Sequence, residues 1–428
     1  MYKNGLFYSG ITMLSLLTHI SLLAVVFAKG NYESILSPLV LSVAVLGLDI
    51  VYFCILKFLK QNTYTFDILL ITLLNMSVIF QSCFGKVGFA VKHFVFVVAA
   101  LVLCQAGFKL VQDYRMIEKR KYIFYGIIGV LIVSILLFTG SRGMWIDLGF
   151  ITIQPSEFLK PFFALVFATS LAEQQKKKKL IGGIKVVYDN WILFGITGAI
   201  VLLQWWCRDL GSLPTFAAVA ACGFIMRICY PKAKLSKKLL IGIGAAGLAV
   251  IVIALKFAPS YVQDRLHVDI WSDPTGNGWQ QCQALIAIAE GGWFGKGPGF
   301  GRLYKVPAAD TDIVFSSICE EWGLLTALLA VVMIMLVIVT SLINRPRSYF
   351  HTTLTVGVCA VFIAQMALNI FGSCNMIPFT GVTIPFISNG GSSMLSCGLM
   401  AGFLKAGQAM VYHVPERRPA PARNRRTA

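Results

Sequence analysis

The residues that could do chemistry gather in the longest polar stretch of the sequence, which runs from Pro259 to Asp312. Acids, bases, aromatic residues and turn-forming Asp-Pro and Gly-x-Gly sequences alternate there. The charged residues of this stretch are Asp264, Arg265, Asp269, Asp273, Glu290, Lys296, Arg302, Lys305, Asp310 and Asp312. Carboxylates can accept protons and cations can neutralise anions, so we expect any catalysis to take place here.

The rest of the sequence consists of apolar runs separated by short polar joints. Its 428 residues are 57% hydrophobic and 13% charged, with a mean hydropathy of +0.75, which excludes a soluble globular protein. We predict about twelve spans of the length that crosses a bilayer. They run approximately over 6–28, 36–58, 65–84, 90–111, 122–139, 157–173, 190–206, 210–228, 238–257, 312–343, 352–372 and 391–412. The predicted fold class is an all-α integral membrane protein with one large loop outside the membrane.

The basic residues fix the predicted orientation of these spans. Much of the net charge of +18 lies in alternate joints, including Lys109 to Lys121, Lys176 to Lys185 and the tail from Arg417 to Arg426. By the positive-inside rule, both termini are cytoplasmic and the large loop is extracytoplasmic. This placement predicts anionic membrane lipids as partners and argues against nucleic acid. A reaction outside the cell has no nucleotide-activated donor, so its substrate must arrive already activated.

Three shorter polar joints face the same side as the large loop. They are GSRGMWIDLGFITIQPS (140–156), WWCRDLGS (205–212) and NMIPFTGVTIPFISNGGSS (375–393). Glu157 and Lys160 follow the first joint, one helical turn apart. The Pro and Gly content of the third joint favours a re-entrant or broken helix that lines a cavity. We therefore expect one site at the outer mouth of the helix bundle.

These motifs, with SDPTGNGWQQCQALIAIAEGGWFGKGPGFG and TDIVFSSICEEWG, occur in an order that resembles the SEDS family of bacterial shape, division and sporulation proteins (RodA, FtsW and SpoVE). The resemblance covers about residues 66–410. It implies a peptidoglycan glycosyltransferase that polymerises lipid II at the outer face of the bacterial cytoplasmic membrane. It also implies a class B penicillin-binding protein, a transpeptidase, as partner.

The resemblance divides the chain into three parts. Residues 1–61 form an added N-terminal transmembrane hairpin, which we expect to be peripheral to catalysis. Residues 62–413 form the polytopic core, whose extracytoplasmic loop is 259–311. Residues 414–428 form a basic cytoplasmic tail that we expect to be disordered.

The implied reaction joins a sugar hydroxyl to an anomeric carbon that carries a lipid pyrophosphate. It needs a base for the hydroxyl proton and cations for the departing undecaprenyl pyrophosphate. Direct displacement of an α-linked donor inverts the anomeric centre and gives β1,4-linked glycan strands. The resemblance places the family's proposed catalytic aspartate at Asp273, although Asp-Pro-x-Gly is also a common turn sequence.

The remaining candidates are proposed to bind substrate at the same mouth: Arg142, Trp145, Glu157, Lys160, Arg208, Asp209, Gln280, Lys296, Arg302, Asp312, Glu320, Glu321, Ser388 and Ser392. Several have a structural alternative. Asp312 could cap the following helix, and Trp145 could anchor the chain at the membrane interface. Glu320 or Glu321 could pair with Lys160 or Arg142 inside the bundle. The run from Gln280 to Ile288 could form a helix at the interface that turns its glutamines toward the site.

Metal and cysteine chemistry have little support in the sequence. A divalent cation, Mg²⁺ or Mn²⁺, could share the pyrophosphate charge, but no cluster has dedicated ligand spacing, and the metal stays unassigned. The eleven cysteines are scattered and lack a CxxC motif, which indicates packing residues.

Two other functions remain open from the sequence. A lipid II flippase or other transporter would place polar residues along the bundle midplane, whereas this chain gathers most of them at one mouth. Asp49 is the exception. A noncatalytic scaffold for cell-wall enzymes would leave the acids of the outer loop dispensable.

Overall fold

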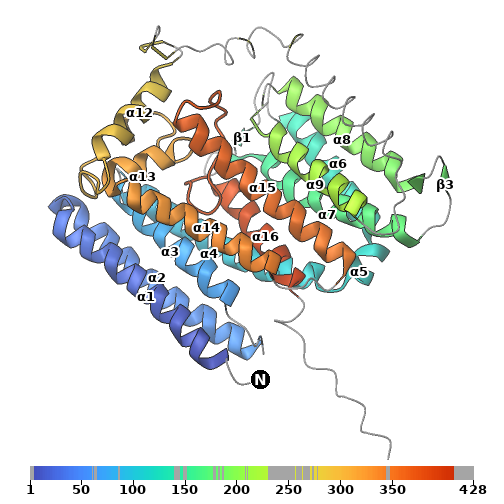
Figure 1. Ribbon diagram of the computed structural model, residues 1–428, viewed down its shortest axis with the longest axis horizontal. Helices are drawn as coiled ribbons and strands as arrows, with labels where there is room; N and C mark the ends of the chain where they lie inside the picture. The colour runs from blue at the N-terminus through green and yellow to red at the C-terminus, as the bar shows by residue number, and fades with distance from the viewer. Residues whose placement is uncertain are drawn as a thin grey trace, which may run out of the picture.

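The structure is a computed structural model that is almost entirely helical (Figure 1). It describes residues 4–59, 61, 65–84, 87–138, 145–147, 152–176, 180–181, 184–185, 188–207, 209, 211–229, 256, 263, 270–271, 274–276, 278–343 and 348–408. The helices of the first half are α1 (Asn4–Lys29), α2 (Tyr32–Phe58), α3 (Thr65–Cys83), α4 (Val87–Val111), α5 (Tyr114–Lys119), α6 (Lys121–Phe138), α7 (Pro155–Lys176), α8 (Tyr188–Trp206) and α9 (Leu213–Cys229).

The second half adds α12 (Trp279–Gly291), the 3-10 turn η2 (Leu303–Lys305), α13 (Val314–Trp322), α14 (Leu324–Ile343), α15 (Tyr349–Ser373) and α16 (Gly391–Gly407). Two antiparallel ribbons of two-residue strands lie in joints: β1 (Ile146–Asp147) with β2 (Thr152–Ile153), and β3 (Leu180–Ile181) with β4 (Ile184–Lys185). Neither ribbon was predicted, because such short strands carry no periodic signal.

The all-α membrane architecture is confirmed. Six described helices, α2, α3, α4, α6, α14 and α15, are long and apolar enough to cross a membrane, and three shorter apolar stretches lie in α1, α8 and α9. Ten predicted spans match one helix each. The predicted span 238–257 lies outside the described residues, apart from Lys256.

The predicted span 312–343 is wrong as one helix. It is divided into α13 and α14 at Gly323, whose φ of +85° favours glycine. A Cβ on Gly323 would lie 2.4 Å from the carbonyl oxygen of Trp293. The close approach of the 293–295 backbone therefore requires a glycine at this break.

The centre of the bundle is built on α3, α4 and α16. Figure 1 shows α1 and α2 along one side, α6 to α9 at the opposite side, and these three helices between them. Helix α16 packs closely on α4, since Cβ atoms on Gly398 and Gly402 would lie 2.4 and 2.2 Å from α4 carbonyl oxygens. Every residue of α3 from Phe66 to Cys83 is buried. The lack of any lipid-facing side explains how α3 can carry polar residues along its length.

A buried ion pair joins α3 to α16. Lys405 Nζ donates to Asp67 Oδ1 at 2.6 Å, and neither side chain is exposed. Tyr52 of α2 also donates to Asp67 Oδ1, at 2.8 Å. Asp67 lies in the first turn of α3 and Lys405 in the last turn of α16, where each charge is favoured by its own helix dipole.

The N-terminal hairpin, α1 and α2, packs on α3. Thr72 donates to Ser15 at 2.5 Å, and Asn75 donates to Asp49 at 2.8 Å. A cavity of about 420 Å³ lies between the three helices and is lined by His19, Asp49 and Asn75 among largely apolar neighbours. The carboxylate of Asp49, which the sequence left unexplained, thus contributes to the contact between the N-terminal hairpin and α3.

Candidate functional site

The first part of the site is the start of α7. Lys160 Nζ donates to Glu157 Oε1 at 2.6 Å, and the lysine side chain is 1% exposed. The other carboxylate oxygen of Glu157 is buried and has no hydrogen-bond partner among the described residues. Ser396 of α16 donates to the carbonyl of Glu157 at 2.8 Å, which fixes this turn of α7 against α16. The predicted one-turn spacing therefore produces a buried charge pair.

The second part is the turn between α8 and α9. Ser212 donates to Asp209 Oδ2 at 2.9 Å. Burial raises the pKa of Asp209, while the Ser212 hydrogen bond and the nearby charge of Lys160 oppose the rise. Gly211 is needed where the turn meets the next loop, because a Cβ there would lie 2.3 Å from the carbonyl oxygen of Thr380. Asp209 is thus placed within electrostatic reach of Lys160.

The third part is the turn that precedes α13. Asn369 of α15 donates to the carbonyl of Asp312 at 2.7 Å and to that of Val382 at 2.7 Å, joining this turn to the loop between α15 and α16. Burial raises the pKa of Asp312 to about 7, opposed by a hydrogen bond from Thr311 and reinforced by nearby carboxylates that include Asp209 and Glu157. The predicted capping role of Asp312 is wrong, because the N-cap of α13 is Ile313 and it has no side-chain cap.

The fourth part is the loop between α15 and α16. Ser388 donates to the carbonyl of Thr311 at 2.7 Å, and Ser392 accepts from the backbone N–H of Gln154 at 2.9 Å. Thr383 and Ser393 share a 2.7 Å hydrogen bond. The expected broken helix is not formed here, since residues 374–390 are turns, bends and irregular backbone. Gly381, with φ +67°, helps to bend the chain beside Asp312.

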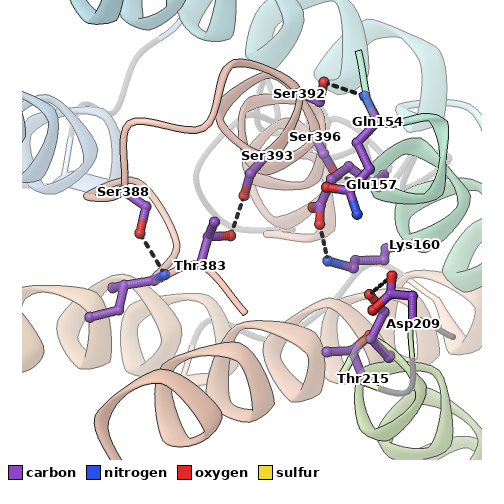
Figure 2. A network of polar contacts seen from close by, with 12 residues as sticks. Gln154, Glu157, Lys160, Asp209, Thr215, Thr383, Ser388, Ser392, Ser393 and Ser396 are labelled. Carbon is purple, nitrogen blue, oxygen red and sulfur yellow. Dashed lines mark hydrogen bonds and ion pairs between the residues drawn. The ribbon is translucent and has the colours of Figure 1, made fainter. Parts of the chain in front are cut away.

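Together these parts form a central polar cluster, defined by Glu157, Lys160, Asp209 and Asp312 with the hydroxyls of Ser388, Ser392 and Ser393. Figure 2 shows the side chains of α7, the 209–215 segment and the 383–396 segment around one region. The cluster joins one buried cation to three carboxylates, which reach one another electrostatically. Such a set can hold an anion at Lys160 and hydroxyl groups at the carboxylates.

Three further predicted residues, Lys296, Arg302 and Glu320, interact with one another around the start of η2 and the end of α13. Lys296 Nζ contacts Glu320 Oε1 at 3.1 Å and also pairs with Glu290. The backbone N–H groups of Arg302 and Leu303 donate to Glu320, each at 2.9 Å. Burial lowers the pKa of Lys296, but the hydrogen bonds to both glutamates outweigh this effect and raise it. Glu320 thus pairs with Lys296, and its predicted pairing with Lys160 is wrong.

Glu321 also binds backbone. Its Oε2 accepts from the N–H of Gly299 at 3.0 Å, and the carboxylate is buried. The predicted pairing of Glu321 with Lys160 is likewise wrong, since Lys160 pairs with Glu157. The two glutamates of α13 therefore shape the loop that carries Lys296 and Arg302.

The remaining candidates lie at the edges or outside the described residues. Gln280 is on α12, the expected helix, and donates to the carbonyl of Pro307 at 2.9 Å. Trp145 is 54% exposed just before β1. Asp273, Arg142 and Arg208 lie outside the described residues.

Gln204 is a further candidate, which was not predicted from the sequence. Its side chain is fully buried, and neither polar atom has a hydrogen-bond partner among the described residues. Its carbonyl accepts from the N–H of Asp209 at 3.0 Å, so Gln204 adjoins the central polar cluster. The sequence offered one indication of this residue, since Gln204 is a polar residue at the end of an apolar run and lies four positions before Arg208.

The described residues contain no group of three or more His, Cys, Asp or Glu side chains that could hold a metal ion. Ten of the eleven cysteines form no disulfide, and six of these ten are buried, as expected for packing residues.

Comparisons with known proteins agree over most of the chain. A family model described as "Cell cycle protein", for FtsW, RodA and SpoVE, matches residues 55–410. A "Probable peptidoglycan glycosyltransferase FtsW" of Synechocystis is 30% identical over 293 residues, covering 64% of this chain and 70% of the relative. One with the same description from Lactococcus lactis is 31% identical over 327 residues, covering 68% and 76%.

A solved structure has a similar fold. A chain from "Structural coordination of polymerization and crosslinking by a peptidoglycan synthase complex" has a TM-score of 0.60 and 22% identity to this chain. The match covers 81% of this chain and 97% of that chain.

Proposed function

The chain belongs to the family of cell cycle proteins that includes FtsW, RodA and SpoVE, and we propose on this premise that it is a peptidoglycan glycosyltransferase. Its proposed substrate is lipid II, and its product is a β1,4-linked glycan strand. The relatives described as probable peptidoglycan glycosyltransferases support this activity.

The observation that carries the proposal is the central polar cluster. Lys160 is a buried cation in an apolar bundle. It pairs with Glu157 and interacts electrostatically with Asp209, and the Asp312 carboxylate interacts in turn with both of these acids. A buried charge of this kind needs partners and marks a functional position in a membrane protein. Lys160 would neutralise the pyrophosphate of the donor, while Asp209 and Asp312 would orient sugar hydroxyls or amides.

Asp273 is the proposed general base. Its carboxylate takes the proton of the acceptor 4-hydroxyl as that oxygen attacks the anomeric carbon of the donor. The bond between this carbon and the pyrophosphate oxygen breaks, and undecaprenyl pyrophosphate leaves. Because attack occurs opposite the leaving group, the α-linked donor yields a β linkage.

The proposed setting is the outer face of the cytoplasmic membrane, with both termini inside. The positive-inside distribution of Lys and Arg supports it. The proposed partner is a class B penicillin-binding protein, supported by the fold shared with a chain of a complex that couples polymerisation to crosslinking.

The test is polymerisation of lipid II by the purified protein together with its partner. We expect glycan strands from the natural protein and a loss of roughly 10²- to 10⁴-fold in Asp273→Asn, which keeps the shape but cannot accept the proton. Asp269→Asn is the matched control in the same loop and should retain activity. Near-normal strand formation by Asp273→Asn would refute the assigned base.

The same preparation separates polymerase from flippase. If the natural protein made no strands but moved labelled lipid II across vesicles, the transport function would replace the proposed one. A requirement for Mg²⁺ or Mn²⁺ is tested by adding a chelator and then restoring each ion; unchanged activity under chelation would exclude this requirement.

A further inference from the structure

The turn between α1 and α2 contacts a glycine-rich loop of the outer region. We define this glycine-rich loop as residues 291–301, GGWFGKGPGFG. The backbone N–H of Asn31 donates to the carbonyl of Pro298 at 3.0 Å. A Cβ on Gly297 would lie 2.3 Å from the carbonyl oxygen of Lys29, so the two backbones are in close contact. Lys29 also lies over the ring of Phe294, 5.9 Å from its centroid.

The opposite side of the same loop is bound to α13. The N–H groups of Lys296 and Gly297 donate to the carbonyls of Glu320 and Glu321 at 2.9 and 3.0 Å. The glycine-rich loop is therefore held between the hairpin turn and the end of α13. Immediately after it, the chain leads through η2 to the turn that carries Asp312.

A second route connects the hairpin to the site through α3. The hairpin is attached to α3 at three levels, by the Tyr52–Asp67, Ser15–Thr72 and Asp49–Asn75 hydrogen bonds. At its outer end, Gln81 of α3 donates to the carbonyls of Asp310 and Ile387, at 3.2 and 3.0 Å. Both carbonyls belong to loops of the central polar cluster.

We propose that the N-terminal hairpin is a positioning element of the polymerase, which holds the glycine-rich loop and α3 in the arrangement that the central polar cluster requires. This replaces the expectation that the hairpin is peripheral. The inference rests on the proposed function for its kinetic readout. Asn31 is the positioning residue that can be tested most directly, because its backbone N–H makes the contact.

The test compares Asn31→Pro with Asn31→Ala in the full chain with its partner. Both remove the side chain, but only proline removes the N–H. A hydrogen bond contributes about 0.5–1.5 kcal/mol, so we expect kcat of the proline variant to fall about 2- to 10-fold below that of the alanine variant. KM should stay similar, because substrate binding is retained while the aligned arrangement becomes less populated. Equal kcat values in the two variants would overturn the proposal.

A crosslink covers the case in which proline prevents folding. Asn31→Cys with Pro298→Cys should form a disulfide across the contact, detected by peptide mass spectrometry, with each single variant as control. If the hairpin is a positioning element, the oxidised protein should polymerise lipid II at least as fast as the reduced protein. Failure to crosslink, or inactivity only when oxidised, would overturn the proposal. Absence of polymerisation in the natural protein would instead refute the proposed function, since the disulfide yield does not depend on it.

Discussion

Glu157 and Lys160 form a 2.6 Å ion pair in which the lysine is 1% exposed and one glutamate oxygen has no partner among the described residues. Removing one member of a buried pair leaves an unpaired charge and typically costs about 3–5 kcal/mol. We therefore expect Lys160→Met to lower the thermal unfolding temperature in detergent strongly. Lys160→Arg is the charge-conserving control.

The double variant Glu157→Gln with Lys160→Met separates stability from function. It removes both charges, so we expect most of the stability to return while polymerisation stays lost. Recovery of both properties would show that the pair has only a structural role.

Asp312 gives a prediction for pH. Its pKa is raised to about 7 from an ordinary 3.8, chiefly by burial. The folded state therefore binds more protons than the unfolded state between these values, and stability falls as pH rises through this range. The stabilising contribution is fully present below pH 3.8 and lost above about 7. Asp312→Asn should remove this fall, so its stability relative to the natural protein should increase from pH 5 to pH 8 in thermal unfolding.

A pH-independent difference between Asp312→Asn and the natural protein would contradict that assignment. Asp310→Asn, two residues earlier, is the control for a general effect of charge in the same turn.

Gly295 gives a prediction for the glycine-rich loop. It has φ +76°, and a Cβ there would lie 2.3 Å from the carbonyl oxygen of Glu321. Gly292 has φ +55° but open space around a Cβ. Both alanine variants carry backbone strain, whereas only Gly295→Ala adds a steric conflict, which typically costs about 1–3 kcal/mol. We expect the lower unfolding temperature for Gly295→Ala, and equal temperatures would show that the loop can move away from α13.

The orientation is tested by labelling intact cells. A cysteine at Ser272 in a cysteine-free background should react with a membrane-impermeant reagent, because the large loop is predicted to lie outside. Reaction only after lysis would reverse the orientation and remove the proposed access to lipid II.

The sequence predicted the helices well where an apolar run of about 20 residues has polar ends, because bilayer thickness sets that length. It failed at Gly323, because the predicted span 312–343 runs through Glu320, Glu321 and this glycine without a break. The backbone N–H of Leu325, just after the break, donates to the carbonyl of Trp293, which lies 30 positions before Gly323. Local hydropathy contains no record of such a contact.

The candidate site was predicted in part. Glu157 with Lys160, and Ser388 with Ser392, occur in recognisable polar motifs at one mouth of the bundle. The partners of Glu320 could not be read in the same way, since any outer cation was available to it by sequence. Glu320 pairs with Lys296 because the glycine-rich loop folds back on α13. There the backbone N–H groups of the loop also donate to the carbonyls of Glu320 and Glu321.

The buried contact between Asp67 and Lys405 has a consequence for biosynthesis. The two residues are 338 positions apart, whereas Tyr52 precedes Asp67 by 15. The ribosome adds Tyr52 before Asp67, and it adds Lys405 only near the end of translation. During most of synthesis, Lys405 is therefore not yet present when α3 enters the bilayer. Over that period the hydroxyl of Tyr52 is the partner available to Asp67. The first two helices thus provide α3 with a polar companion during membrane insertion, and the final helix completes the assembly by supplying the charge.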